Sequence, residues 1–222
     1  MNEQDTPTIA YRPLEKSDDK AVADLMSLVW GFDQVASKRT ARQMAYILFH
    51  DLLQVATFSS VAIQDGAIVG IVLGRSKADS QPPKLVNVKK QFHTLLLLFT
   101  EEGKEAVQSF KRQKQVNEGL YSQAKRAFEG KLQLLAVHPS ARTLGIGSHL
   151  YDSFIHYMNE KKGSHFYAFA DNRLSYDFFE HKELKRDAVI TRNMPFFNQT
   201  VTFYLYSKEL SPSQTIKNTS QP

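Results

Sequence analysis

The stretch from residue 132 to residue 150, LQLLAVHPSARTLGIGSHL, constrains the fold more than any other part of the chain. An apolar run ends at Val137, and the segment from Arg142 to Gly147 then opens a helix, so the pattern predicts a strand, a short loop and a helix N-terminus. The first N–H groups of a helix lack intrahelical partners and the helix dipole is positive there, so anions bind readily. Glycines allow close backbone approach. The segment therefore predicts a site for a pyrophosphate-bearing cofactor.

Two other glycine-containing phosphate motifs do not fit this segment. A Rossmann fingerprint needs a third glycine where Leu150 stands, and the Gly-Lys-Ser/Thr of a P-loop does not follow. An ordinary capped strand-to-helix turn would leave Arg142 and both glycines unexplained.

The segment resembles the acyl-CoA-binding motif of the GCN5-related N-acetyltransferase (GNAT) superfamily, Arg/Gln-x-x-Gly-x-Gly/Ala after a strand. Arg142, Gly145 and Gly147 match it. Residues 172–184 resemble a second family motif, Asn-x-x-Ala-x-x-Phe-Tyr-Glu-x-x-Gly-Phe, with matches at Asn172, Phe178 and Glu180. Two motifs in the right order extend the resemblance over essentially the whole chain outside an insertion and the tail.

The second motif departs from the family at two positions. Glu183 stands at the glycine position, and Phe179 stands where the family has a tyrosine. That tyrosine hydroxyl is thought to protonate the departing CoA thiolate, which phenylalanine cannot do. Tyr176 lies three residues earlier, about one helical turn away, and is our candidate for the acid. The alternative is that Tyr176 packs against the sheet.

The resemblance implies an α/β fold of GNAT type: a mixed, mostly antiparallel central sheet flanked by helices, with a helical insertion between the third and fourth strands. It also implies acetyl-CoA as the acyl-donor cosubstrate and no metal. The residues it assigns to CoA binding are Leu135, Ala136, Val137, Arg142, Thr143, Leu144, Gly145, Ile146, Gly147, Ser148, Asn172 and Phe179.

The general base is less evident. Some relatives use a carboxylate on the fourth strand, and Glu129 precedes the corresponding run here. Glu129 is therefore a candidate base, or else a solvated residue at the end of the insertion. His138 follows the strand beside the cofactor loop, where an imidazole has a useful pKa, but we expect it to cap the loop or face solvent.

We expect one acetyltransferase domain of the GNAT type over residues 1–210, as the resemblance implies, and a polar tail over 211–222. We expect a first strand at 9–13, helices near 18–30 and 38–54, and a hairpin around Asp65-Gly66. Residues 76–130 form the insertion, with helices over 88–100 and 105–128 separated by Gly103. The insertion is either a solvated hairpin packed on the sheet or a lid that shapes the acceptor pocket.

Composition narrows the function classes. The chain has no cysteine, which excludes a disulfide framework, a thiolate metal site and a cysteine nucleophile. The apolar runs are too short to cross a bilayer, and residues 1–13 lack a signal-peptide pattern. We therefore expect a cytoplasmic protein without a membrane partner. The net charge of +5 suits an anionic partner such as CoA, while scattered basic residues make nucleic acid an improbable partner.

The sequence thus predicts an N-acetyltransferase that moves an acetyl group from acetyl-CoA to a primary amine of a small molecule or a protein. The alternative is a GNAT fold that binds CoA with weak or no catalysis and serves as a regulatory or interaction module. The family resemblance also makes a homodimer an expectation. The acceptor amine is not readable from the sequence.

Overall fold

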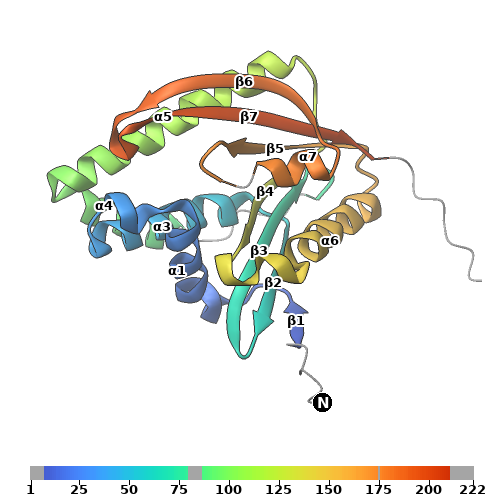
Figure 1. Ribbon diagram of the computed structural model, residues 1–222, viewed down its shortest axis with the longest axis horizontal. Helices are drawn as coiled ribbons and strands as arrows, with labels where there is room; N and C mark the ends of the chain where they lie inside the picture. The colour runs from blue at the N-terminus through green and yellow to red at the C-terminus, as the bar shows by residue number, and fades with distance from the viewer. Residues whose placement is uncertain (1–7, 80–86, 175, 211–222) are drawn as a thin grey trace, which may run out of the picture.

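The computed structural model describes residues 8–79, 87–174 and 176–210, and the predicted tail over 211–222 lies outside them. A seven-stranded sheet runs through the described chain in the order β1-β2-β3-β4-β5-β7-β6 (Figure 1). Only the β4–β5 pair is parallel. The strands are β1 (Ile9–Arg12), β2 (Phe58–Gln64), β3 (Ala67–Ser76), β4 (Gly130–Val137), β5 (His165–Asp171), β6 (Lys185–Met194) and β7 (Gln199–Glu209).

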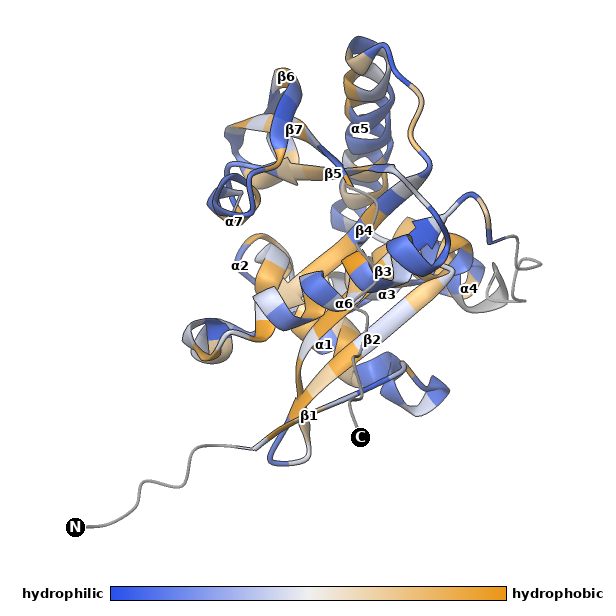
Figure 2. Ribbon diagram, turned by 90° about the vertical axis from the view of Figure 1, so that its right-hand side faces the viewer, coloured by the Kyte–Doolittle hydropathy of each residue, from blue (hydrophilic) through white to orange (hydrophobic). Residues whose placement is uncertain are grey.

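The two faces of the β2–β4 part of the sheet are covered by different helices (Figure 2). Helices α1 (Asp19–Trp30), α2 (Phe32–Val35) and α3 (Lys38–Val55) pack on one face, around Val22, Met44 and Leu73. Helix α6 (Ile146–Glu160) packs on the other face through Ile146, Leu150 and Phe154, which are fully buried. This apolar spacing of three to four residues is the stripe expected of an amphipathic helix.

The hairpin between β2 and β3 forms at the predicted place. Asp65 and Gly66 both have positive φ, at 51° and 78°, as a two-residue type I′ turn requires. Helix α3 also matches its predicted range within one residue.

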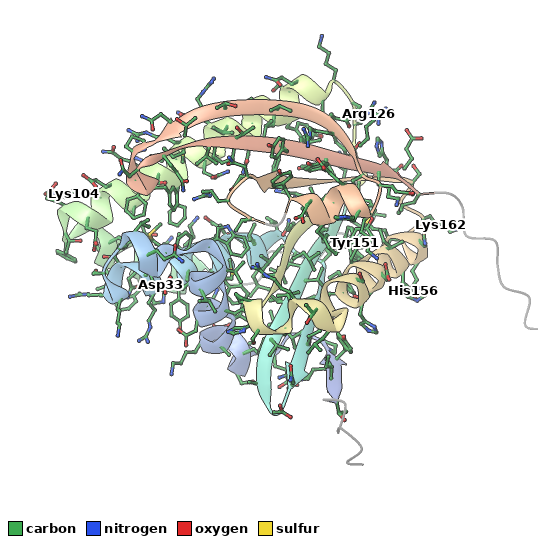
Figure 3. All side chains as sticks on the ribbon, viewed as in Figure 1. Asp33, Lys104, Arg126, Tyr151, His156 and Lys162 are labelled. Carbon is green, nitrogen blue, oxygen red and sulfur yellow. The ribbon has the colours of Figure 1, made fainter. Side chains whose placement is uncertain are left out.

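The insertion consists of two helices, α4 (Asn87–Leu98) and α5 (Glu101–Ala124). Helix α4 lies against α3, and α5 packs on β6 and β7, where Val116, Leu120, Phe203 and Leu205 form an apolar cluster. Figure 3 shows α5 crossing the molecule from the side of Lys104 to the side of Arg126. The insertion is therefore part of the same packed body as the sheet.

The predicted break at Gly103 is wrong, because α5 begins at Glu101 and includes that glycine. The helix boundary is set by Thr100, whose side chain accepts a hydrogen bond from the Gly103 N–H at 3.0 Å. A Cβ on Gly103 would lie 2.0 Å from the carbonyl oxygen of Leu97. The glycine thus permits the end of α4 to approach α5 closely, and does not interrupt the helix.

Among the described residues of the second motif, only Asp177–His181 form a helix, α7. Asn172 instead extends the pairing of β5 with β7. Its N–H donates to the Thr202 carbonyl, and its side-chain oxygen accepts from the Thr202 N–H, both at 3.0 Å. These two bonds continue the pairing by one residue, and the chain then turns at Asn172 and Arg173, where the Leu174 N–H donates to the Asp171 carbonyl at 3.2 Å.

Strand β4 contains a bulge, and the bulge changes the face of the sheet to which the following side chains of β4 point. Leu132 pairs with Gly74 and Leu134 pairs with Leu73, so Gln133 is the extra residue. Leu132 packs with α6, whereas Leu134 packs with the α1–α3 side. The pairing of β4 with β5 covers only Gly130 to Leu132. From Gln133 onward the two strands separate, and this opening positions the functional site.

Candidate active site

A cavity of about 420 Å³ lies where β4 and β5 separate. We call it the large cavity. One wall is the β4 segment Leu132–Val137, and the far end is formed by Arg142, Gly145, Gly147 and Ser148 at the start of α6. The opposite side comes from β5 and from α7, which stands in front of β5 beside α6 (Figure 1). The cavity therefore joins an exposed strand edge to a helix N-terminus.

The helix N-terminus has the features expected of an anion site. A 3₁₀ turn (Pro139–Leu144) leads to Gly145, whose φ is +73°, and α6 starts at Ile146. A side chain at Gly145 would have no atom within 4 Å, so nothing crowds the backbone there. Arg142 is exposed and has no ion-pair partner within the described residues. Free N–H groups and an unpaired guanidinium together suit a pyrophosphate.

His138 caps the 3₁₀ turn. Its Nδ1 accepts a hydrogen bond from the Ser140 N–H at 3.3 Å. The expectation that His138 caps the loop is confirmed.

The exposed edge of β4 is the second feature of the large cavity. The pairing with β5 stops at Leu132, so the β5-facing backbone groups further along β4 have no strand partner. Leu135, Ala136 and Val137 line the cavity along this edge. Backbone N–H and C=O groups of a free edge can pair with an extended, amide-containing chain, which is the chemistry of the pantetheine arm of CoA.

The structure gathers most of the residues assigned to CoA binding, but not all of them. Those at the cavity are Leu135, Ala136, Val137, Arg142, Gly145, Gly147, Ser148 and Phe179. Thr143, Leu144, Ile146 and Asn172 do not line it. Ile146, the first residue of α6, is fully buried, Leu144 is exposed, and the side chain of Asn172 is bonded to β7. Their side chains are therefore directed to packing, solvent and strand pairing respectively.

Glu129 lies away from the large cavity. It precedes β4, whereas the cavity occupies the other end of that strand. Its carboxylate accepts hydrogen bonds from the backbone N–H and the hydroxyl of Ser164, the latter at 2.8 Å. The Ser164 N–H lowers the pKa of Glu129. Glu129 thus joins β4 to the segment before β5, and its position does not suit a general base.

Phe179 and Tyr176 both line the large cavity from the α7 side. Phe179 stacks on Tyr206, with ring centroids 5.6 Å apart. Tyr176 lies beside Tyr204, at 5.3 Å between centroids, and its hydroxyl has no hydrogen-bond partner in the described part of the chain. Asp177 and His181 of α7 also reach this cavity, and both are exposed.

A smaller cavity of about 130 Å³ lies next to the large one. The two share Trp30, Gln133, Phe169, Ala170 and Leu174 as walls. Helix α5 of the insertion lines the small cavity through Ser109, Phe110, Gln113 and Asn117. That the insertion acts as a lid stays a prediction. Sequence reasoning missed the small cavity, because its walls come from segments far apart in the chain.

The small cavity has a positively charged wall. Arg173 and Lys131 line it, together with one carboxylate, Asp171. The Arg173 Nε and Nη2 atoms donate to Asp171 at 3.0 and 2.8 Å. Lys131 Nζ lies 4.8 Å from the centre of the Phe169 ring, and burial, with a smaller contribution from Arg75, lowers its pKa to about 8. The acid is thus paired with Arg173, while Lys131 adds a second cation to the lining of the same cavity.

Within the described residues, no group of three or more His, Asp or Glu side chains is arranged to hold a metal ion. Nor does any helix in that part of the chain have the length and apolar content that crossing a membrane requires.

The chain is similar to known acetyltransferases. The family model of the acetyltransferase (GNAT) family matches residues 22–183, which run from α1 to the turn after α7. No curated protein sequence shows significant similarity to the chain.

Several solved structures share the fold. An N-acetyltransferase from Staphylococcus aureus Mu50 is 14% identical, with a TM-score of 0.53 over 92% of this chain and 99% of that chain. The ribosomal-protein-S18-alanine N-acetyltransferase from Escherichia coli is 9% identical, with a TM-score of 0.51 over 94% and 98%. The C-terminal condensation domain of Ebony, in complex with beta-alanyl-dopamine, is 10% identical, with a TM-score of 0.61 over 92% and 100%.

The mixed sheet, the opening between β4 and β5, and the glycine-containing start of α6 agree with the family match over most of the chain. This protein belongs to the acetyltransferase (GNAT) family.

Proposed function

We propose that this protein is an acetyl-CoA-dependent N-acetyltransferase that acts on a primary amine. The observation that carries the proposal is the adjacency of two cavities across Gln133. The large cavity joins a free strand edge to a helix N-terminus, which suits a thioester donor with a pyrophosphate. The small cavity lies on the other side of the same wall and suits the acceptor.

The large cavity fits the donor on physical grounds. The start of α6 and Arg142 would hold the pyrophosphate, and the free edge of β4 at Leu135, Ala136 and Val137 would hold the pantetheine arm. A backbone N–H of that edge would polarise the thioester carbonyl. Acetyl-CoA supplies the acetyl group and a thiolate that leaves readily.

The reaction needs one bond to form and one to break. The amine nitrogen attacks the carbonyl carbon, the new C–N bond forms, and the C–S bond breaks. The amine gives up a proton and the thiolate gains one, so the products are an amide and free CoA. Tyr176 is our proposed proton donor to the thiolate, because it lines the large cavity with an unengaged hydroxyl.

Deprotonation of the acceptor amine does not need a dedicated carboxylate in the small cavity. Asp171 lines that cavity, but Arg173 occupies both of its oxygens. We propose that the amine reaches the site in its neutral form and that its second proton leaves after attack, to water.

Titration calorimetry with acetyl-CoA, together with a free-thiol release assay on a panel of primary amines, tests this function. We expect micromolar binding and amine-dependent thiol release. Absence of acetyl-CoA binding at any reasonable concentration would refute the proposal.

The alternative is a CoA-binding module without catalysis, and Phe179 at the tyrosine position is the observation that favours it. The alternative predicts the same acetyl-CoA binding but no thiol release on a broad amine panel. The two functions are therefore separated by the second half of the same experiment.

A further inference from the structure

Two buried polar atoms of residues that line the small cavity have no hydrogen-bond partner among the described residues. They are Oε1 of Gln133 and Nη1 of Arg173. An unsatisfied buried polar atom costs free energy, and such atoms in a folded protein call for an explanation. One is a hydrogen-bond acceptor and the other is a charged donor, so a ligand that carries both a donor and an anion would satisfy them together.

Gln133 is placed where an acceptor amine has to be. It is the bulged residue of β4, and it lines both cavities. Because the bulge turns Gln133 out of the regular pairing with β3, its side chain belongs to the wall between donor and acceptor. A side-chain amide oxygen accepts a hydrogen bond from an amine N–H. Gln133 can therefore hold the amine next to the thioester.

Arg173, which also lines the small cavity, is held by several contacts. Two of its nitrogens bind Asp171 at 3.0 and 2.8 Å, and its guanidinium lies over the Phe197 ring at 4.0 Å from the centre. The side chain is 13% exposed. The remaining nitrogen, Nη1, has a fixed direction and a positive charge. Such a group is well suited to bind a carboxylate.

The charge balance of the small cavity also favours an anionic ligand. Asp171 offsets the charge of Arg173, but Lys131 adds a second, largely buried cation. Burying a cation without a counter-ion is costly, and a bound carboxylate would lower this cost. A ligand that carries an amine but no carboxylate would add another hydrogen-bond donor to a cavity lining that already contains several, and would leave the positive charges without a counter-ion.

Apart from these charged groups and the polar side chains of Gln133, Ser109, Gln113 and Asn117, the lining of the small cavity is mostly apolar. Its lining includes Trp30, Phe32, Leu48, Leu52, Phe110 and Phe197. These side chains come from helices α1, α2, α3 and α5 and from the turn before β7. They suit an aromatic or aliphatic group and offer no charged partner to it.

We infer that the acceptor is a free amino acid with an apolar side chain. Its amine is held by Gln133, its carboxylate by Arg173 with Lys131 nearby, and its side chain by the apolar wall. This inference rests on the proposed acetyl transfer and names its acceptor class. The products are the N-acetyl amino acid and free CoA: the amine's proton leaves to water, and the CoA thiolate takes a proton from Tyr176, which water then restores.

The test compares amines that differ only in the carboxylate. We expect kcat/KM for L-phenylalanine to exceed that for 2-phenylethylamine and for L-phenylalaninamide by at least about tenfold, the value of one charge-assisted hydrogen bond. In Arg173→Met this ratio falls toward one. Lys111→Met on the exposed side of α5 is the matched control and keeps the ratio of the unsubstituted protein.

Removal of Arg173 alone leaves the Asp171 carboxylate buried without its partner, which could unfold the protein. A second variant avoids this unpaired charge. The double variant Asp171→Asn with Arg173→Gln removes both charges together, and we expect the same loss of preference. Gln133→Leu removes the amine acceptor, and we expect kcat/KM to fall for all three amines.

Two outcomes would overturn the inference, namely equal kcat/KM values for the three amines or a carboxylate preference that survives in both Arg173 variants. Calorimetric titration with N-acetyl-L-phenylalanine separates this failure from failure of the proposed function. Arg173-dependent binding of this product, without thiol release from any amine, would support the carboxylate site and refute the catalytic function. Thiol release that is equally fast with and without a carboxylate on the amine would support the catalytic function and refute the carboxylate site.

Discussion

The ring of Phe179 stacks on the ring of Tyr206, with centroids 5.6 Å apart and planes 28° from parallel. The Tyr206 hydroxyl donates to Glu180 at 2.8 Å and accepts from Arg186 at 3.3 Å. Burial raises the pKa of Tyr206 to about 12. The position of the usual family tyrosine is thus occupied by a packed ring without a hydroxyl, and the hydroxyl behind it is engaged in a network.

Tyr176→Phe tests the proposed proton donor. If Tyr176 protonates the thiolate, we expect kcat to fall by about 10- to 100-fold, at or below the lower end for general acid catalysis because a thiolate leaves readily. The affinity for acetyl-CoA should stay the same, because the substitution removes one hydroxyl from the cavity wall. The measurement is thiol release at saturating substrate, with calorimetry as the binding control.

Phe179→Tyr in the Tyr176→Phe background gives the reciprocal test. A hydroxyl restored at the family position should recover part of the lost activity. Unchanged turnover in Tyr176→Phe alone would remove Tyr176 from the mechanism.

Gly147→Trp should abolish acetyl-CoA binding. Gly147 lines the large cavity at the start of α6, so an indole there would fill the space proposed for the pyrophosphate. Gly147→Ala is the matched control, because its Cβ would meet Phe178 and Val137 at ordinary contact distances of 3.5 and 3.6 Å. Calorimetric titration should show binding in the alanine variant and none in the tryptophan variant. Equal affinities in the two would place the donor elsewhere.

Lys131→Met should stabilise the protein at pH 7. The pKa of Lys131 is about 8 in the folded protein, because of burial and then Arg75, and about 10.4 in an unfolded chain. Between these values the unfolded chain binds more protons, so this group makes stability rise with pH from about 8 to 10.4. Removal of the lysine should raise the free energy of unfolding at pH 7 by about 1–3 kcal/mol.

Urea unfolding at pH 7, 8, 9 and 10 measures this effect. We expect a smaller rise in stability above pH 8 in Lys131→Met than in Lys111→Met, whose lysine is exposed on α5. Parallel pH profiles for the two variants would contradict the prediction. A gain in stability with a loss of amino acid acetylation would show that the lysine is retained for function.

Glu183→Gly should stabilise the turn after α7. Glu183 stands at the family's glycine position and has a φ of 59°, in the left-handed region. A non-glycine residue in this backbone conformation destabilises the folded protein by about 1–2 kcal/mol. Glycine removes that cost, but it also raises the conformational entropy of the unfolded chain, which offsets part of the gain. We therefore expect a net gain of up to about 1 kcal/mol in unfolding free energy. Glu183→Ala keeps the backbone penalty and should show no gain, so a similar gain in both variants would mean that the side chain is responsible.

The sequence alone was sufficient for the family and for the glycine-containing start of α6. Local patterns specified the hairpin at Asp65-Gly66, the helix from Lys38, and the strand-to-helix junction at Gly145 and Gly147. Each of these depends on the conformational preferences of neighbouring residues, which a single sequence displays directly. The bounds of α5 and α7 were less predictable, because Thr100 and Asn172 form hydrogen bonds that periodicity does not encode.

Only the tertiary structure decided the small cavity, where we propose that the acceptor binds. Gln133 lines both cavities because it is the extra residue of a bulge in the pairing of β3 with β4, which interrupts the regular alternation of side chains along β4. Glu129, a candidate base in the sequence, was placed at the other end of the strand and bonded to Ser164. Lys131 and Arg173 came together with α5 through packing between segments distant in sequence. Local preference fixes a backbone junction, whereas burial and charge depend on which distant segments meet.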